Sequence, residues 1–253
     1  MGKDVLRKRM QSSPFFVVGL SVAFVIVVSV IFLPFFTGYS PTANSLTSTF
    51  QKLDWLSHGL SGNILGTDEL GRDIFTRLLY GGRYSLFIAA VVVLLQVFLG
   101  TSLGILAGYF GGILDTIVMR LCDIVLAIPN LILAIAIMAV VGVNMTNLIF
   151  VLTFAGWVDC CKVTRNNVLV IKNREFVHAS VVLGASHGHI MFTQILPNVT
   201  THIIILASQR FGFTILLEAA LSFLNLGIQP PVPSWGNMIA GGRSFMTRKR
   251  CCQ

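Results

Sequence analysis

Long runs of apolar residues dominate the chain, and short polar segments separate them. The first run extends from Pro14 to Phe36 without a charged residue. A helix needs roughly 20 apolar residues to cross a hydrocarbon core of about 30 Å, so this run predicts a membrane span. It is too long for a signal-peptide core, and no A-x-A-like cleavage site follows it. We therefore expect a permanent first span over residues 14–36.

Four further apolar runs predict four further spans. The fold class is therefore all-α, a polytopic membrane helical bundle of about five spans, with the four later spans in a core over residues 85–226. Small residues in the second span would let helices approach closely, and Pro129 is expected to kink the third. The apolar parts of the four later spans are Leu86–Ala107, Ile124–Val143, Leu148–Val158 (extended through Cys161) and about Ile203–Phe223.

Two longer polar segments are expected on the outer side. In residues 37–84, Asp68 is suited to cap a helix, and apolar residues follow it at helical spacing. That helix would either lie on the outer membrane face as an amphipathic helix or pack as an ordinary loop helix, and the pattern favours neither. Residues 227–253 begin with helix-breaking prolines, so we expect an outer loop and a basic tail there.

Composition supports a membrane protein and excludes a soluble domain. The 253 residues are 55% hydrophobic and only 11% charged, whereas soluble domains carry about 25% charged residues. The net charge of +8 could suggest nucleic-acid binding, but the basic residues lie between apolar spans and form no continuous groove. We therefore expect no nucleic-acid partner. Basic residues are retained on the cytoplasmic side of membranes, and the basic residues 1–13 place the N-terminus in the cytoplasm.

Two serine motifs invite a comparison with hydrolases. Residues 184–188 spell G-x-S-x-G, but a nucleophile elbow needs a strand before the serine, and the residues before Ser186 predict a helix. Ser61 lies in a G-x-S-G pattern, yet in a polar loop and not in a span. We therefore expect no catalytic residue, and a membrane serine hydrolase is only a remote alternative.

Metal and phosphate sites are not predicted either. His187 and His189 would point about 200° apart on a helix, and no acidic cluster supports them. The sequence contains no G-x-x-x-x-G-K-[ST] pattern. Energy-driven work by this protein would therefore draw its energy from a partner.

Four ionisable residues lie in or beside predicted spans. Arg210 and Glu218 fall within the fifth span, where an ionisable residue is costly and marks either a functional site or a pair between helices. Arg120 and Asp123 precede the third span and are three residues apart, so they could pair on one helical face. All four are candidates for a translocation path or for interhelical pairing.

Residues 162–198 form a polar, basic stretch between the fourth and fifth spans, which the same charge rule places in the cytoplasm. Residues Glu175–Leu183 predict a short helix, which Gly184 would end. Ser186 could cap a second helix that runs through Leu196. The product would be a protruding helix–turn–helix, a shape that suits a lever rather than a reaction centre.

This stretch resembles the EAA loop of ABC-importer permeases, whose pattern is roughly E-A-A-x3-G followed by I-L-P. The matching residues are Glu175 at the start of the loop, then His178, Ala179, Ser180, Gly184, Ile195, Leu196 and Pro197. Stretches beginning "GTDELGRD", "DTIVMRLCD" and "LLEAALSFLNLG" resemble the second permease subunit of dipeptide, oligopeptide and nickel importers. The resemblance runs along nearly the whole chain in the family's order.

The resemblance implies a multi-pass permease subunit of a bacterial cytoplasmic (inner) membrane importer. Peptide is the first choice of cargo, and nickel or a metal chelate stays open as the alternative. The implied partners are a second permease subunit in a heterodimer, two ABC ATPase subunits docked on the EAA loop, an extracytoplasmic substrate-binding protein and membrane lipid. The chain would be no enzyme and bind no cofactor, and ATP would be used by the partner subunits.

Two departures from the family pattern bear on this reading. His178 stands where the family has a glutamate and Ser180 where it has the second alanine, which affects a polar contact but not the docking shape. The family has six spans, so a chain with five is expected to lack the last one. A truncated, non-functional permease remnant is therefore a further alternative.

Overall fold

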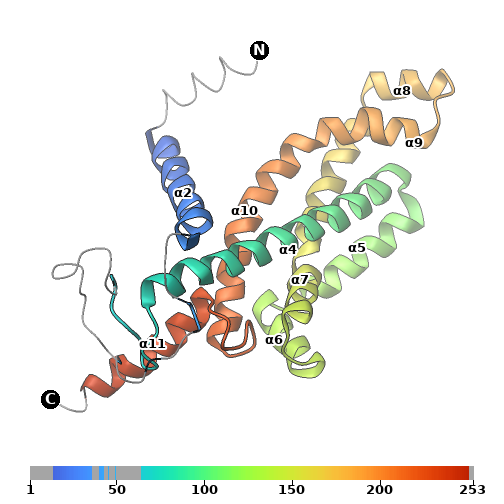
Figure 1. The fold of residues 1–253 in the computed structure, drawn as a ribbon. Coiled ribbons are helices and arrows are strands. Elements are labelled where there is room, and N and C mark those ends of the chain that lie inside the picture. Colours follow the sequence, from blue (N-terminus) through green and yellow to red (C-terminus); the bar gives the residue numbers. More distant parts are fainter. Residues whose placement is uncertain (1–13, 36–39, 43–44, 46–48, 50–63, 251–253) are drawn as a thin grey trace. The chain divides into compact units, whose positions relative to one another are not determined.

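A computed structural model describes residues 14–35, 40–42, 45, 49 and 64–250, and the long elements among them are all helices (Figure 1). The chain divides into two compact units, one of Met1–Tyr84 with Pro231–Ser234 and the other of Ser85–Pro230 with Trp235–Gln253. The basic segment 1–13 and the serine at position 61 lie outside the described residues.

Helix α2, Pro14–Phe32, and the short helix η1, Leu33–Phe35, occupy the range predicted for the first span. The guanidinium of Arg83 donates a hydrogen bond of 3.0 Å to the carbonyl oxygen of Ile31. The same guanidinium lies 4.8 Å from the ring centroid of Phe35. Arg83 thus contacts the end of α2 and the following helix η1.

The second span is longer than predicted and absorbs the expected outer helix. Helix α4, Ile74–Phe110, is continuous, so the separate amphipathic helix predicted before the span is wrong. It begins after Asp73, whose Oδ2 accepts a hydrogen bond of 2.8 Å from the backbone N–H of Thr76. Gly81 lies inside this helix. A Cβ at that position would lie 3.3 Å from the backbone of Ser234. The glycine therefore permits a close approach.

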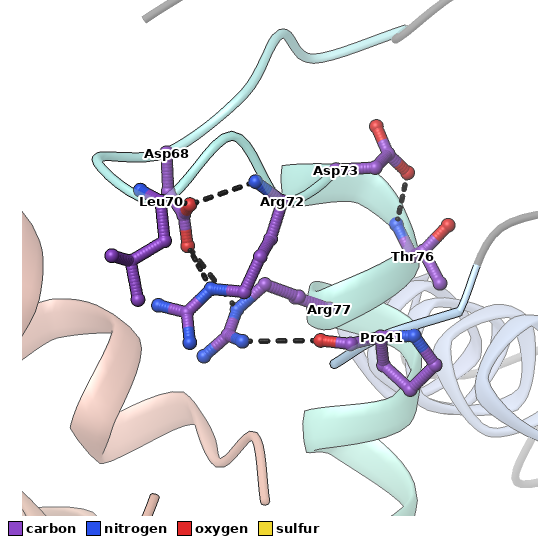
Figure 2. Close-up of polar contacts among 7 residues, drawn as sticks. All are labelled: Pro41, Asp68, Leu70, Arg72, Asp73, Thr76 and Arg77. Carbon is purple, nitrogen blue, oxygen red and sulfur yellow. Dashed lines mark hydrogen bonds and ion pairs between the residues drawn. The ribbon is translucent and has the colours of Figure 1, made fainter. Parts of the chain in front are cut away.

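Asp68, the expected cap, instead organises the turn ahead of α4 (Figure 2). Its Oδ1 accepts hydrogen bonds of 2.9 Å from the backbone N–H groups of Leu70 and Arg72. Its Oδ2 accepts one of 2.8 Å from Nε of Arg72 and lies 3.6 Å from Nε of Arg77. Arg77 in turn donates to the carbonyl oxygen of Pro41 at 3.1 Å. The motif "GTDELGRD" is thus a compact, hydrogen-bonded turn.

Small residues in α4 let it approach helix α7, Met145–Lys172, closely, as predicted. A Cβ on Gly104 would lie 2.6 Å from the carbonyl oxygen of Cys161, and one on Gly100 would lie 2.5 Å from the Cβ of Cys160. The buried Gln96 amide adds a hydrogen bond of 2.9 Å to the carbonyl oxygen of Leu152. The two long helices are therefore in close contact along this stretch.

The third span is broken rather than kinked. Helices α5, Gly112–Leu126, and α6, Asn130–Val141, meet at 86°. Pro129 stands at the N-cap of α6 in an extended conformation, and a proline also disfavours the helical conformation of the residue before it. Within the described residues, four helices are long and apolar enough to span a membrane, or five spans result if this bent pair counts as one.

After α7, the described chain forms four helical segments and a last helix, α11. Helix α7 runs on to Lys172, so it includes the first residues of the predicted polar stretch. Helices α8, Glu175–Val182, and α9, His187–Ile190, follow it. A π-helical segment η4, Met191–Ile195, leads directly into α10, Leu196–Phe223. The segment expected as a loop and tail is helical from Trp235 to Arg250, where it forms helix α11 and packs against α10; its outer position stays a prediction.

Candidate coupling site and the charged groups of the spans

The helix–turn–helix predicted after α7 is present, and we name residues 174–190 the lobe. Helix α8 ends at the turn where Gly184 has a φ of 81°, a conformation that favours glycine. Ser186 then caps α9, its Oγ accepting a hydrogen bond of 3.4 Å from the N–H of His189. The lobe lies at the end of the bundle where α4 passes into α5 (Figure 1).

An apolar cluster anchors the lobe to the bundle. Val177 of α8 and Ile190 of α9 are buried against Ile105 and Tyr109 of α4 and Val168 of α7. Burying a side chain of this size contributes about 1.5–3 kcal/mol. The same cluster includes Ile195 and Val199. The lobe is therefore packed against three long helices and is not a loose loop.

The other side of α8 is open. Glu175, His178 and Ala179 are exposed, and the exposed fractions of Val182 and Leu183 are both 85%. Two large apolar side chains this exposed at the tip of a polar lobe are costly in water. This arrangement favours a surface that a protein partner covers.

Ser180 links the two halves of the lobe. Its hydroxyl accepts a hydrogen bond of 2.5 Å from Nε2 of Gln194 in η4 and donates one of 3.0 Å to the carbonyl oxygen of Phe176. An alanine at this position could make neither bond. The departure from the family pattern at Ser180 therefore has a structural consequence in this chain.

The I-L-P residues are placed unequally. Ile195 is fully buried, Leu196 is half-buried and Pro197 is exposed. The prediction that the second helix ends at Leu196 is wrong, because α9, η4 and α10 are continuous. The N–H of Leu196 bonds to the carbonyl oxygen of Met191, five residues back. The wider π-turn leaves space for the ring of Pro197. Pro197 itself has no N–H to donate.

Tyr109, at the end of α4, connects the lobe to two helices. Its hydroxyl lies 2.9 Å from Nδ1 of His187 in α9. Its carbonyl oxygen accepts a hydrogen bond of 2.5 Å from Nζ of Lys172 in α7. We call Tyr109, Lys172 and His187 the latch, since they tie the ends of α4, α7 and α9 together.

Replacing Tyr109 with phenylalanine is expected to loosen this connection. The loss of one hydrogen bond costs about 0.5–1.5 kcal/mol, so the protein should still fold. If the chain works in an ABC importer, as the resemblance implies, coupling between ATP hydrolysis and transport should decrease. The measurement is the amount of cargo taken up per ATP hydrolysed in reconstituted transporter. Tyr84→Phe, at an exposed tyrosine of the same helix, should leave that ratio unchanged. An equal loss in both variants would contradict the latch.

Two ion pairs join α5 to α7. Arg165 donates to both carboxylate oxygens of Asp115, at 2.9 and 2.5 Å. Nζ of Lys162 lies 2.8 Å from Oδ1 of Asp123. The predicted pair of Arg120 with Asp123 is therefore replaced by one between helices, and Arg120 is exposed. A partner on the adjacent helix could not be found from spacing within one helix.

Arg210 pairs across helices within the membrane-spanning part. It is buried in α10 and forms an ion pair with Asp159 of α7. This is the interhelical pairing that the sequence left open. From the sequence, Asp159 was predicted only as part of an extended helix, and its pairing role was not predicted. The rule that singled out Arg210, that an ionisable residue in a span is costly, would also have singled out Asp159.

Glu218 is fully buried and lies one helical turn before Ser222. The Ser222 hydroxyl donates a hydrogen bond of 2.7 Å to Oε1 of Glu218 and accepts one of 3.2 Å from the N–H of Ile228. A Cβ on Gly236 would lie 2.6 Å from the Cβ of Ser222. Glu218 thus supports the packing of α10, the following loop and α11.

The serine of the G-x-S-x-G pattern stands at a helix N-terminus, not at an elbow. Helix α8 and a turn precede Ser186, and no strand is present anywhere in residues 64–250. The neighbouring His187 directs Nδ1 to Tyr109. Neither residue has the arrangement of a hydrolase nucleophile and its base.

Comparison with known proteins identifies the chain's relatives. Residues 100–247 match the family model described as "Binding-protein-dependent transport system inner membrane component". The dipeptide transport system permease protein DppC of Haemophilus influenzae is 37% identical over 229 residues, covering 90% of this chain and 78% of that protein. The di/tripeptide transport system permease protein DppC of Pseudomonas aeruginosa is 38% identical over 230 residues, covering 91% and 76%.

A third relative is a permease subunit of Bacillus subtilis. The oligopeptide transport system permease protein OppC of Bacillus subtilis is 34% identical over 242 residues, which cover 94% of this chain and 76% of that protein. These matches confirm the resemblance and the multi-pass, all-α fold inferred from the sequence. The chain belongs to the family of inner membrane components of binding-protein-dependent transport systems.

Proposed function

We propose that this chain is a permease subunit of an ABC importer that moves di- and oligopeptides across the bacterial cytoplasmic membrane. It would work with a second permease subunit, two ABC ATPase subunits and an extracytoplasmic binding protein. The chain binds no cofactor in this proposal, and the ATPase subunits use the ATP. The lobe, with its apolar tip exposed and its base packed into the bundle, is the observation that carries the proposal.

The charges around the lobe support a cytoplasmic position. Lys162, Arg165 and Lys172 lie along the last turns of α7, and Arg174 is the N-cap of α8. Basic residues concentrate on the cytoplasmic side of bacterial membrane proteins. The lobe would therefore face the ATPase subunits, and the N-terminus would lie on the same side.

The packing of the lobe suits a lever. Movement of α8 by an ATPase would pass through the buried cluster and the latch to α4 and α7. It would pass to α10 directly, because α9, η4 and α10 form one continuous helical stretch. Rigid elements packed in this way transmit displacement because their interiors are dense. The spans would rock between outward and inward access.

The turn before α4 and the loop after α10 would receive cargo from the binding protein. Hydrogen bonds and ion pairs hold the outer turn around Asp68 rigid (Figure 2). The loop that follows α10 is held by Ser222. Two ordered outer segments of this kind could dock a folded partner without a large loss of conformational entropy.

Uptake of labelled cargo tests the proposal. The complete transporter in liposomes, with its binding protein and ATP, is expected to accumulate labelled di- and oligopeptides and not nickel. Uptake of nickel without uptake of peptide would contradict the peptide assignment. Accumulation of neither, by a transporter whose ATPases are active, would contradict the import function.

The docking role of the lobe has a sharper test in Leu183. Leu183→Glu should leave the chain folded, because the side chain is 85% exposed. It should nevertheless lower uptake and ATPase stimulation by about tenfold, as expected when a charge enters an apolar contact centre. His178→Glu restores the family's glutamate on the same exposed side and should preserve both activities. Normal coupling in Leu183→Glu would contradict the docking site.

A further inference from the structure

An open groove lies between α4 and the continuous stretch of η4 and α10, within the second compact unit. Residues 97–106 supply one wall and residues 191–203 the other, and the cavity volume is about 490 Å³. Eight of its eleven lining residues are apolar, and the other three carry hydroxyl groups: Thr101, Ser102 and Thr200. A lining of this kind favours a ligand that is itself largely hydrocarbon.

The size of the groove decides between a helix and a single chain of methylene groups. From Val97 to Leu106 the wall on α4 is about 14 Å long at 1.5 Å per residue. Over this length, the volume of about 490 Å³ corresponds to a cross-section of about 35 Å². A helix with its side chains is at least about 10 Å across, which corresponds to about 80 Å², so a helix of another subunit would not enter. An extended acyl chain, whose carbon atoms need only about 4 Å to their neighbours, fits.

The latch marks one end of the groove. Ile105 lines the groove one helical turn before Tyr109, and Met191 lines it one turn after His187. The ring of Phe110 lies 5.9 Å from that of His187, and the Tyr109 hydroxyl lies 2.9 Å from Nδ1 of the same histidine. The apolar groove therefore leads to a group of aromatic and polar side chains.

A cation without a counter-ion stands at this end. Nζ of Lys172 has three N–H donors, and the carbonyl oxygen of Tyr109 accepts one of them. Within the described residues, no carboxylate pairs with Lys172, whereas Lys162 and Arg165 of the same helix each pair with an aspartate. An apolar groove that ends at an unpaired ammonium group is complementary to an apolar chain that carries an anionic group.

We propose that this groove binds one acyl chain of an anionic phospholipid, with the lipid phosphate beside Lys172. The length of about 14 Å matches one leaflet of a hydrocarbon core of about 30 Å. Ile105 also belongs to the cluster that anchors the lobe, so a bound chain would brace the base of the lobe against α4. The site requires a position in a membrane and does not rest on peptide as the cargo.

Photolabelling tests the groove in the complete transporter. The transporter is placed in phosphatidylcholine nanodiscs that contain a small fraction of phosphatidylglycerol with a diazirine on its acyl chain. Thr200→Trp fills the groove, whereas Ile205→Trp adds the same ring at a position that is 56% exposed and lies about 140° around α10. Labelling of residues 97–106 and 191–203 should decrease about tenfold in Thr200→Trp, the factor for roughly 1.4 kcal/mol of lost binding. Ile205→Trp should be labelled like the native chain.

The anionic headgroup has its own pair of variants. Lys172→Gln should lower the labelling about fivefold, because a basic residue near the membrane surface contributes about 1 kcal/mol to the attraction of anionic lipid. Arg120→Gln removes the same charge from an exposed position on α5 and should leave the labelling unchanged. Unlabelled phosphatidylglycerol should compete with the photoreactive lipid, whereas the phosphatidylcholine of the nanodisc does not.

The outcomes separate the groove, the charge and the kind of occupant. Equal labelling in Thr200→Trp and Ile205→Trp would overturn the groove as a lipid site, even in a transporter that imports peptide. Labelling that Lys172→Gln does not lower would overturn the preference for an anionic lipid. Label on the second permease subunit in place of this chain would assign the groove to a protein partner and overturn the lipid. If Thr200→Trp fails to accumulate, Ser102→Trp fills the groove from the opposite wall and decides.

Discussion

Gly104→Ala is expected to destabilise the protein by about 1–3 kcal/mol, the usual cost of overpacking a dense interior. The added Cβ would lie 2.6 Å from the carbonyl oxygen of Cys161 and 2.8 Å from the Cβ of Thr164. The carbonyl belongs to the backbone of α7 and cannot rotate away, so α4 and α7 must separate. The separation would also weaken the hydrogen bond between Gln96 and the carbonyl oxygen of Leu152.

A matched substitution isolates the contact from helix propensity. Gly212 lies within α10, and a Cβ there would meet no atom within 4 Å. Alanine generally stabilises a helix relative to glycine by about 1 kcal/mol, so Gly212→Ala should have no effect or raise stability. Thermal unfolding of the purified chain in detergent measures both variants. A similar change of Tm in the two would show that the approach of α4 to α7 is unimportant.

Asp159→Leu is expected to be more damaging than Arg210→Met. Removing Asp159 leaves the guanidinium of Arg210 unpaired with a side chain only 8% exposed, and breaking a buried pair in this way costs about 3–5 kcal/mol. Removing Arg210 leaves a carboxylate that is 42% exposed and is therefore less enclosed by the protein than the guanidinium. The two single variants should therefore differ in the free energy of unfolding, although each removes the same ion pair.

The double variant completes the comparison. With both charges removed, no unpaired guanidinium is left in the interior. The free energy of unfolding should therefore be well above that of Asp159→Leu. Unfolding of the four proteins in detergent gives the interaction energy directly. Additive losses in the double variant would mean that Arg210 and Asp159 do not depend on each other. A larger loss of unfolding free energy in Arg210→Met than in Asp159→Leu would contradict the argument from the different burial of the two side chains.

Local features of the lobe were predictable because they depend on neighbouring residues. Gly184 ends α8 in a left-handed conformation that glycine adopts without strain, and Ser186 caps α9 through its own hydroxyl. Each is a short-range interaction encoded within a few positions. The role of the lobe in docking an ATPase subunit stays a prediction, for which the Leu183→Glu experiment is the test.

The ends of long helices were less predictable. A polar segment reads as a loop, yet α7 continues to Lys172 because its charged residues find partners on α5. A proline predicts a helix end, yet the helical stretch from α9 to α10 continues through Pro197, because the π-turn accommodates the ring. Likewise α4 starts at Ile74 and runs without a break. Gly81 within it permits a close contact with the backbone of Ser234. These outcomes depend on what lies beside each helix.

The sequence by itself determined that this protein is an all-α membrane protein with a helix–turn–helix lobe, because hydrophobic runs and capping residues act locally. Only the tertiary structure decided which charges meet. It paired Asp123 with Lys162 instead of Arg120 and joined Arg210 to Asp159. The reason is physical: a charge in a span must find a partner, and the partner is selected by packing between helices that are distant in sequence.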